Sequence, residues 1–185
     1  MTDILPDENL ANYRSLLSRV DQHCGKICEE FAEQLSCRAG CSACCQHLTL
    51  FPVEAANLVT AVEQLPSELR ALLAGRIQWP ESGTCPLLLD DRCAVYASRP
   101  VICRTHGLPL LADVEGVQTV DCCPENFREA EALPGSAVLN LESLNCALVA
   151  INALFVASNE DVRFKGKDRF TIADIILFSI FEEKV

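Results

Sequence analysis

The stretch Cys37-Arg-Ala-Gly-Cys41-Ser-Ala-Cys44-Cys45 places four cysteines within nine positions of a 185-residue chain that carries twelve. The stretch ends in two adjacent cysteines. Three kinds of chemistry use thiols that are grouped in this way: a disulfide crosslink, a redox switch and a metal site. The rest of the sequence helps to choose between them.

The composition argues against a disulfide framework. Half of the residues are hydrophobic, so the chain can bury a core without crosslinks. Disulfide frameworks serve mainly small secreted domains that lack such a core. The segment from Met1 to Asn9 has no basic start and no apolar run, so no secretory signal is visible. We therefore expect a cytoplasmic protein, and in that reducing compartment grouped cysteines more often bind metal or do redox chemistry.

The charge and the apolar runs limit the partners. A formal net charge of −11 repels phosphate backbones, so we expect no nucleic-acid partner. One basic segment, residues 163–170, is interpreted as a solvated loop between two helices rather than as a docking site for an acidic protein. The longest apolar runs, residues 146–157 and 175–181, are shorter than a bilayer-spanning helix needs, so we expect no membrane partner.

The sequence predicts a single domain, 1–185, that is mostly helical around an irregular, cysteine-rich middle with small hairpins. Apolar residues recur every seven positions from Leu10 to Phe31, which predicts an N-terminal helix over 8–35. Further predicted elements are an extended piece at 48–51, a helix from Pro52 to about Val62 and a helix from Pro66 to near Trp79-Pro80. The C-terminal helices span 139–185: residues 139–156 are predicted to form a buried helix, and Thr171 to Asp174 resembles a capping box for the last one.

Short segments with turn signals fill the region between Cys85 and Cys123. One hairpin is predicted from residues 86–89 and 94–96 around Asp90-Asp91, and another from 110–114 and 117–120 around Glu115-Gly116. A helical turn that carries Cys103 is expected after Arg99-Pro100. Together with the first cysteine stretch, this region makes residues 37–127 the predicted metal-binding core.

Grouped thiols on irregular loops favour a metal site. Thiolates in such loops can converge on one point, and soft sulfur selects zinc, iron–sulfur clusters or copper(I). Gly40 provides the backbone freedom for a sharp turn around that point. The first set holds Cys37, Cys41, Cys44 and Cys45, and the second holds Cys85, Cys93, Cys103, Cys122 and Cys123. Cys24, Cys28 and Cys146 lie on helical patterns. Cys24 and Cys28 are four residues apart on one helix face, as two ligands would be, but Cys24 lies in the apolar seam, so a core role is favoured for them and is predicted for Cys146.

The adjacent cysteines restrict the geometry of the site. Neighbouring side chains diverge, so Cys44 and Cys45 are not expected to bind one tetrahedral ion together. One of them faces a second metal or packs as a small apolar residue. Eight of the nine grouped thiolates would supply two four-ligand sites, or one cluster with a bridged neighbour. We expect at least one metal to take ligands from both sets, because neither set alone completes two sites.

Other residues near the cysteines are candidates for supporting roles. A zinc ion held by four thiolates leaves two negative charges, which nearby guanidinium groups could offset. His106 has ligand-like spacing from Cys103, although a histidine that orients a turn would look the same. His47 follows the first set and is open to either interpretation. The candidate cations are Arg38, Arg92, Arg99 and Arg104.

The ordered cysteine pattern resembles the YkgJ-type cysteine-cluster family. The resemblance covers the first cysteine stretch, Cys85-Pro-Leu-Leu, the segment from Cys93 to Arg104, and the piece from Cys123 to Phe127. It implies a domain that chelates zinc or iron. The last piece favours Cys123 over the extra Cys122. The implied ligands are Cys37, Cys41, Cys44, Cys45, Cys85, Cys93, Cys103 and Cys123.

Three functions are compatible with these residues. The first is a metal-binding protein that holds zinc, iron or an iron–sulfur cluster. The second is an iron–sulfur-dependent methyl-transfer enzyme, because the family includes a flagellin lysine N-methylase and the spacing of Cys37, Cys41 and Cys44 is that of radical S-adenosylmethionine enzymes. Those enzymes place the motif after a strand of a long barrel, whereas here a helix precedes it. The third is a zinc-based redox switch. No catalytic residue and no protein partner is indicated.

Overall fold

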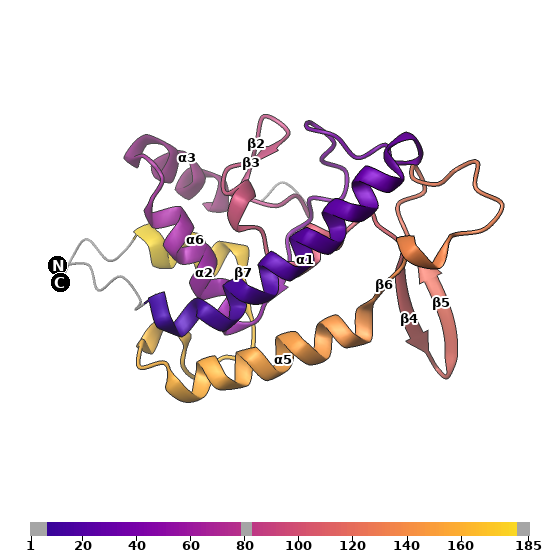
Figure 1. Cartoon of the computed structure of the whole chain (residues 1–185). Helices are drawn as coiled ribbons and strands as arrows, with labels where there is room; N and C mark the ends of the chain where they lie inside the picture. Colours follow the sequence, from indigo (N-terminus) through magenta and orange to yellow (C-terminus); the bar gives the residue numbers. More distant parts are fainter. Residues whose placement is uncertain (1–6, 79–82, 181–185) are drawn as a thin grey trace.

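The structure, a computed structural model, describes residues 7–78 and 83–180, which form one mostly helical unit with small sheets (Figure 1). The α-helices are α1 (Ala11–Glu30), α2 (Pro52–Glu63), α3 (Ser67–Gln78), α4 (Val101–Thr105), α5 (Leu141–Ser158) and α6 (Ile172–Ile180). The strands are β1 (Thr49–Leu50), β2 (Leu88–Leu89), β3 (Arg92–Cys93), β4 (Leu110–Val114), β5 (Val117–Asp121), β6 (Leu139–Asn140) and β7 (Phe170–Thr171). The predicted fold class is confirmed.

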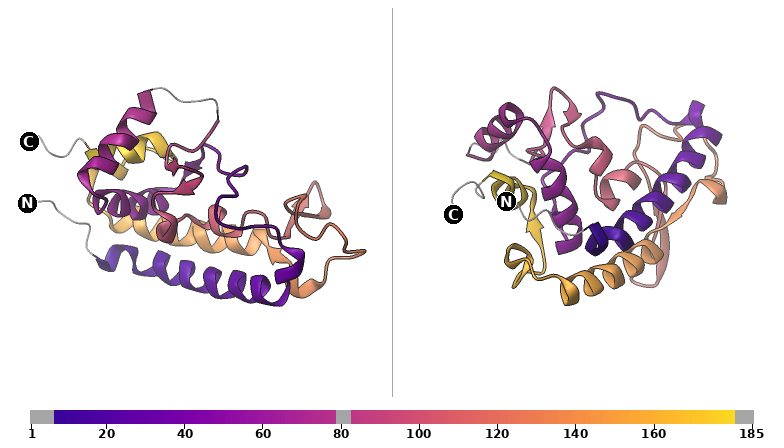
Figure 2. Two further views of the ribbon diagram at one scale, coloured as in Figure 1. Left: turned by 90° about the horizontal axis from the view of Figure 1, so that it is seen from above. Right: turned by 60° about the vertical axis from the view of Figure 1, so that its left-hand side comes forward.

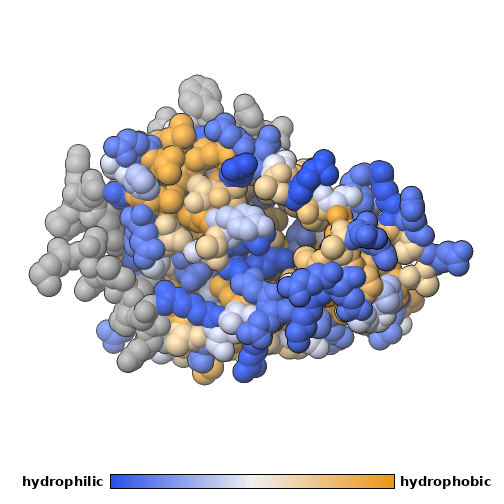
Figure 3. Space-filling model, turned by 45° about the horizontal axis from the view of Figure 1, so that its top comes forward, coloured by the Kyte–Doolittle hydropathy of each residue, from blue (hydrophilic) through white to orange (hydrophobic). Residues whose placement is uncertain are grey.

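The apolar side of α1 lies against the core as its heptad spacing predicts. The buried residues of this helix are Tyr13, Leu17, Val20, Cys24 and Ile27. The regular helix ends at Glu30, before the predicted Leu35, and a 3-10 turn at Ala32–Gln34 continues the chain. Polar side chains cover the outer side of α1, and Figure 3 shows hydrophilic residues across the middle of this face.

The core lies between α1, α2, α5 and α6. Nearly every residue of α2 is buried, because α5 and α6 both pack against it. The antiparallel pair Thr49↔Thr171 and Leu50↔Phe170 joins β1 to β7, so the starts of α2 and α6 lie next to each other. Figure 2 shows α1 and α5, the two long helices, side by side. This framework holds the ends of the loops that carry the cysteines.

The first hairpin differs from the prediction in its second strand. Asp90 and Asp91 both have left-handed backbones, with φ of 47° and 58°, as a two-residue hairpin turn requires. The strand therefore resumes immediately at Arg92, where β3 pairs with β2, and the predicted strand at 94–96 is wrong because a 3-10 turn begins at Tyr96. The second predicted hairpin is confirmed as β4 and β5.

The helix α5 differs most from the prediction. It begins at Leu141, because residues 139–140 pair with β4 and Asn140 caps the helix through Ser143 N at 2.8 Å. Only Leu148 and Phe155 are buried in it, so the prediction of a buried helix is wrong. A helix that is apolar on most faces does not reveal from sequence which faces are covered. Here one side meets α1 and α2, and the opposite side faces outward.

The length of α5 also corrects an expectation. Its 18 residues, with a mean hydropathy of 1.6, are long and apolar enough to cross a membrane by length and composition. The apolar run is therefore not too short. One side of α5 nevertheless belongs to the core, where Asn152 Oδ1 accepts a hydrogen bond from Val53 N at 3.2 Å. The expectation of no membrane partner stays a prediction.

The C-terminal segment confirms the predicted capping box and shows a loop at the basic segment, in which the Arg163 side chain is only 12% exposed rather than solvated. The capping box is present, with Asp174 Oδ2 accepting from Thr171 N at 2.8 Å and Thr171 Oγ1 accepting from Asp174 N at 3.0 Å. The basic segment is a loop between α5 and α6, and within it Arg163 lies 3.1 Å from Glu63 and Lys167 lies 3.4 Å from Asp174. The predicted end of α3 near Trp79-Pro80 falls outside the described residues.

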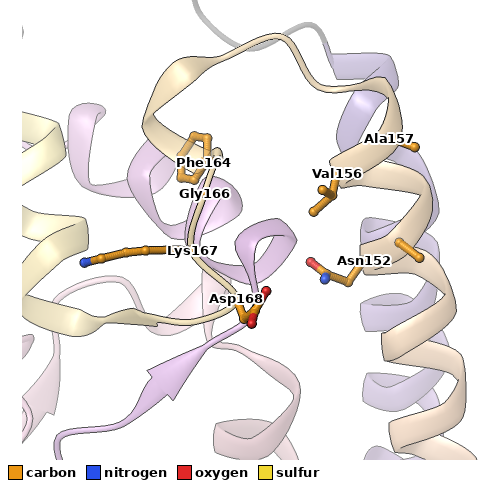
Figure 4. Close-up of a pocket in the computed structure, with 8 residues that line it drawn as sticks. Asn152, Val156, Ala157, Phe164, Gly166, Lys167 and Asp168 are labelled. Carbon is orange, nitrogen blue, oxygen red and sulfur yellow. The ribbon is translucent and has the colours of Figure 1, made fainter.

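A hollow of about 540 Å³ lies between the C-terminal part of α5 and the loop of residues 164–168. Figure 4 shows Asn152 and Val156 on the helix side, with Lys167 and Asp168 on the loop. No cysteine lines this hollow. It is therefore separate from the region that the sequence singles out.

A buried carboxylate connects three helices at the base of the cysteine region. Glu54 is 3% exposed, and its Oε2 accepts from Phe51 N at 3.3 Å as the cap of α2. Its Oε1 accepts from Val101 N at the start of α4 at 3.2 Å and from Tyr13 Oη at 3.5 Å. Burial raises the pKa of Glu54 above its usual value, against the lowering effect of these donors. The position of α4, and of Cys103 within it, depends on this side chain.

We predict that Glu54→Ala destabilises the protein by about 2–4 kcal/mol, because it leaves the donors of Val101 and Tyr13 buried without an acceptor. Chemical denaturation measures the free energy of unfolding. As a control, Glu160→Ala removes an exposed carboxylate and should change this free energy by less than about 0.5 kcal/mol. Equal effects of the two substitutions would contradict the role assigned to Glu54.

The exposure of α5 predicts a difference between two isolated cysteines. A maleimide should label Cys146 rapidly in the native protein, because this residue is exposed, and should label Cys24 slowly, because only 8% of Cys24 is exposed. Mass spectrometry of the labelled peptides measures both rates. Protection of Cys146 would show that the outer side of α5 is covered in solution.

Candidate metal centre

The thiols gather on the loops at one side of the helical framework. All twelve cysteines are free, so no disulfide crosslinks the chain. Figure 1 shows the loop after α1 and the β2–β3 hairpin on the same side of the molecule. Two contacts join them: an isolated antiparallel bridge pairs Gln46 with Thr84, and Ser42 Oγ donates to Asp91 Oδ1 at 2.7 Å. The two sets of cysteines, far apart in sequence, are thereby brought together.

Four half-buried thiols form a group that we call the inner thiols. They are Cys45, Cys85, Cys93 and Cys103. Cys85 N donates to Cys45 O at 3.0 Å, which fixes the two backbones side by side. Leu88 N donates to Cys85 O at 3.0 Å, and Leu88 pairs with Cys93 across the hairpin. Cys103 comes from the middle of α4. Each inner thiol thus comes from a different local element.

Burial and mutual repulsion both act on the inner thiols. Burial raises the pKa of Cys103 to about 12, and the neighbouring thiols of Cys85, Cys93 and Cys45 add to the rise. Burial raises the pKa of Cys85 to about 11, again with contributions from Cys93 and Cys45. Burial also raises the pKa of Cys93 and of Cys45. These interactions show that all four sulfurs lie in one neighbourhood.

Two arginines supply positive charge to the inner thiols. Arg99 lies between Tyr96 and α4: its guanidinium stacks 3.6 Å from the Tyr96 ring centroid, and Nη1 donates to Cys103 O at 3.4 Å. Its charge lowers the pKa of Cys45, Cys93 and Cys103 against the larger effect of burial. Arg76 on α3 acts on Cys85 in the same direction. Among the described residues, the buried Nε of Arg76 has no hydrogen-bond partner.

The remaining cysteines of the family pattern form a second group that we call the outer thiols, of which Cys37, Cys41 and Cys44 are exposed and Cys123 is half-buried. Gly107 lies between two of them: a Cβ added to it would lie 3.2 Å from Cys37 Sγ and 3.6 Å from Cys123 Cβ. Cys123 N also donates to Gly107 O at 3.3 Å. The start of the first set and the end of the second therefore meet at Gly107.

Two of the outer thiols, Cys41 and Cys44, lie on a pair of tight turns just before the inner thiol Cys45. Cys41 N donates to Arg38 O at 3.0 Å, and Cys45 N donates to Ser42 O at 2.8 Å. Burial raises the pKa of Cys44, with contributions from Cys45, Cys41 and Cys37. Burial raises the pKa of Cys45 as well, and there the contributions come from Cys93 and Cys41. The adjacent cysteines thus reach towards different partners, as their divergence along the chain predicts.

The isolated cysteines divide differently from the prediction. Cys24 is a buried core residue, as predicted, and burial raises its pKa to about 11. Cys28 and Cys146 are exposed, so their assignment to the core is wrong. Cys146 lies on the outer side of the apolar helix α5, and Cys28 lies outside the buried side of α1. The pKa of Cys28 is raised by burial and then by Cys37, so Cys28 lies near the outer thiols, and Cys122 interacts with Cys123 and Asp121.

The arginines and histidines proposed to support the metal site differ in what they contact. Arg99 adds positive charge beside the inner thiols, whereas Arg38 and Arg92 are exposed. Arg104 is used elsewhere: it forms a salt bridge with Asp21 and donates to Ala97 O at 2.6 Å. His47 Nε2 accepts from Ala173 N at 3.4 Å, which joins it to α6.

The cysteine sulfurs are donors that suit a thiophilic metal, but in this structure they do not surround a common point. Within residues 7–78 and 83–180, no group of three or more His, Cys, Asp or Glu side chains has the geometry of a metal site. The sulfurs are near one another, unbridged and accompanied by arginine charge. Zinc and iron–sulfur clusters select such donors. Small shifts of side chains and loops would be needed for the sulfurs to converge on a shared point.

Sequence reasoning missed three residues of this region: Gly107, Asn126 and Arg76. Gly107 has φ +92°, which L side chains rarely adopt, and a Cβ there would lie only 3.2 Å from Cys37 Sγ. Asn126 lies in the Cys123–Phe127 piece, three residues after a candidate ligand, and that spacing was the available signal. Arg76 reaches the inner thiols from α3, far away in sequence, so no local pattern could have indicated it.

The comparisons with known proteins agree with the residues that meet here. No curated protein and no solved structure matches the chain. One family model matches residues 36–132, a span of just over half of the chain that contains both the inner and the outer thiols. Its description is "putative zinc- or iron-chelating domain". The chain therefore belongs to this cysteine-cluster family, CxxCxxCC.

Proposed function

We propose that this protein binds zinc or iron through eight cysteines arranged as two four-thiolate centres. The inner centre uses Cys45, Cys85, Cys93 and Cys103, and the outer centre uses Cys37, Cys41, Cys44 and Cys123. The observation that carries the proposal is the gathering of four half-buried, unbridged thiols from four separate chain segments. Free cysteine is often buried alone in a core, but four together with a guanidinium group are better explained as ligands.

The division into two centres follows from the chain at Cys44 and Cys45. Adjacent residues cannot easily direct both sulfurs at one ion, and the two thiols here interact with different partners. Cys41 interacts with both thiols, so the two centres are neighbours. A single larger cluster with a bridging thiolate uses the same eight residues, and metal counting distinguishes it from two separate ions.

The absence of ligand geometry is consistent with a centre that forms when the metal binds. Thiols with raised pKa are neutral at pH 7 and do not repel one another strongly. A preformed thiolate site rarely exists in the unfolded chain, so the free energy of metal binding contributes to the free energy of folding. The metal would supply a crosslink between the loop after α1 and the residues from Cys85 to Cys123.

The residues support metal chelation more directly than any reaction at the metal. The described residues contain no parallel barrel, and α1 leads into the first cysteine stretch, so nothing specific favours the methyl-transfer alternative. The exposure of Cys37, Cys41 and Cys44 leaves the outer centre open to solvent. A cytoplasmic location, where these thiols stay reduced, suits the proposal.

Anaerobic reconstitution tests the proposal. With zinc, we expect the wild-type protein to bind two equivalents, and Cys93→Ser to bind one, because only the inner centre loses a ligand. Cys146→Ser is the matched control and should keep both equivalents. Metal analysis after desalting measures the stoichiometry. Binding of fewer than one equivalent by the wild type, or equal losses in the two variants, would refute the proposal.

Reconstitution with iron and sulfide identifies the native metal class. A brown protein with visible charge-transfer absorption would show an iron–sulfur centre, and a colourless protein that retains only zinc would show zinc sites. The same serine variants apply to both outcomes. In each case Cys93→Ser should lower the metal content and Cys146→Ser should not.

A further inference from the structure

Asn126 has an unusual position for a polar side chain in an exposed loop. It is only 3% exposed, although its neighbours Glu125 and Arg128 lie at the surface. Its Nδ2 lies 2.7 Å from Gly107 O and 3.4 Å from Cys37 Sγ. Its Oδ1 accepts from Ser36 N at 2.8 Å. One amide thus contacts the two chain segments that meet at the outer thiols.

The hydrogen-bond partners fix the orientation of this amide. Ser36 N can only donate, so it must face the carbonyl oxygen of Asn126, and Gly107 O can only accept, so it must face the amino group. A flip of the amide would place like groups against each other on both sides. The group nearer to Cys37 Sγ is therefore the N–H donor, at 3.4 Å, and the sulfur is its acceptor, while Oδ1 lies farther from the same sulfur, at 3.9 Å.

The surrounding backbone holds Asn126 in place. Asn126 N donates to Cys123 O at 2.9 Å, and Phe127 N donates to Gln34 O at 2.8 Å. Phe127 has a left-handed φ of 53°, which a bulky residue adopts only when its surroundings impose it, and its ring packs 5.7 Å from Phe31. The side chain of Asn126 is thus preorganised, independently of any metal.

We propose that Asn126 is a positioning residue of the outer centre, where its amide N–H hydrogen-bonds to the Cys37 sulfur and directs it towards the metal. This inference rests on the proposed function, since it assigns a role within that centre. A thiolate that accepts an N–H bond is stabilised as a ligand, and loss of such a partner typically costs about 10- to 100-fold in metal affinity. Gly107 lies close to the same sulfur, since a Cβ added to it would be 3.2 Å from Cys37 Sγ.

Cobalt(II) is a suitable probe, because its absorption reports both the number of thiolate sites and the sulfur-to-metal charge transfer. We expect two equivalents in the wild-type protein. Asn126→Ala should weaken one of them by about 10- to 100-fold and leave the other unchanged. At saturating cobalt, the charge-transfer band of the weakened site should move to longer wavelength, because a sulfur without an N–H donor is more easily oxidised. If Asn126 only held the loop in place, without a hydrogen bond to the sulfur, its removal would not shift this band.

Asn126→Asp separates the donor from the shape of the side chain. It keeps an oxygen for Ser36 N but places a carboxylate beside the sulfur, so we expect a loss of affinity at least as large as that of the Ala variant. Should the Asp variant fail to fold, as judged by circular dichroism, the band shift of Asn126→Ala decides the question. Asn159→Asp is the control, because Asn159 is also buried but its amide contacts Asp161 O, in the turn after α5.

The outcomes distinguish failure of the proposed metal binding from failure of the role assigned to Asn126. A wild-type protein that binds no cobalt overturns both the proposed function and the role of Asn126. Two equivalents in the wild type, with both or neither weakened in Asn126→Ala, overturn only the role of Asn126. An unshifted band at saturation does the same.

Discussion

The gathering of four half-buried thiols from four chain segments is the constraint on which the cysteine region depends. The main core lies between the helices, and the cysteine loops reach it through only a few apolar residues such as Leu87, Val95 and Val101. A second, smaller cluster joins α1 to the loops through Leu108 and Phe127. Between these anchors the chain is held by turns. A bound metal would convert neighbouring thiols into a crosslink and restrict the loops between them.

The helical core and the thiols are coupled through polar groups. Glu54 links the start of α4 to α1 and α2, so the backbone that carries Cys103 is fixed by a buried carboxylate. Arg104, next to Cys103, is held by Asp21 of α1. Arg99 brings its charge to the inner thiols and bonds to the backbone of α4. Residues that bind no metal, such as Glu54 and Arg104, therefore determine where the cysteine sulfurs lie.

The sequence predicted the elements whose signal is local. The heptad seam of α1, the capping box at Thr171 and the turn at Glu115-Gly116 each follow from neighbouring residues, and each is present. The exposure of α5 could not be predicted, because a helix that is apolar on most faces does not show how many neighbours it will have. The same reason explains the wrong assignment of Cys146 to the core, whereas Cys28 lies outside the buried side of α1.

The candidate site shows the same limit. The spacing of the cysteines and the resemblance to the family indicated which residues matter, but not which thiols meet. The pairing of Cys45 with Cys85, and of Cys37 with Cys123 at Gly107, depends on loops that cross far from their sequence positions. Asn126 and Arg76 act at a distance in sequence for the same reason.

X-ray absorption at the zinc edge of the zinc-loaded protein tests the central claim most directly, because it reads the atoms around the metal. The account predicts a shell of sulfur alone, four per zinc, at about 2.3 Å. Nitrogen or oxygen ligands at about 2.0–2.1 Å as the main shell would contradict it. The metal would then lie elsewhere, and the gathered thiols would need another explanation.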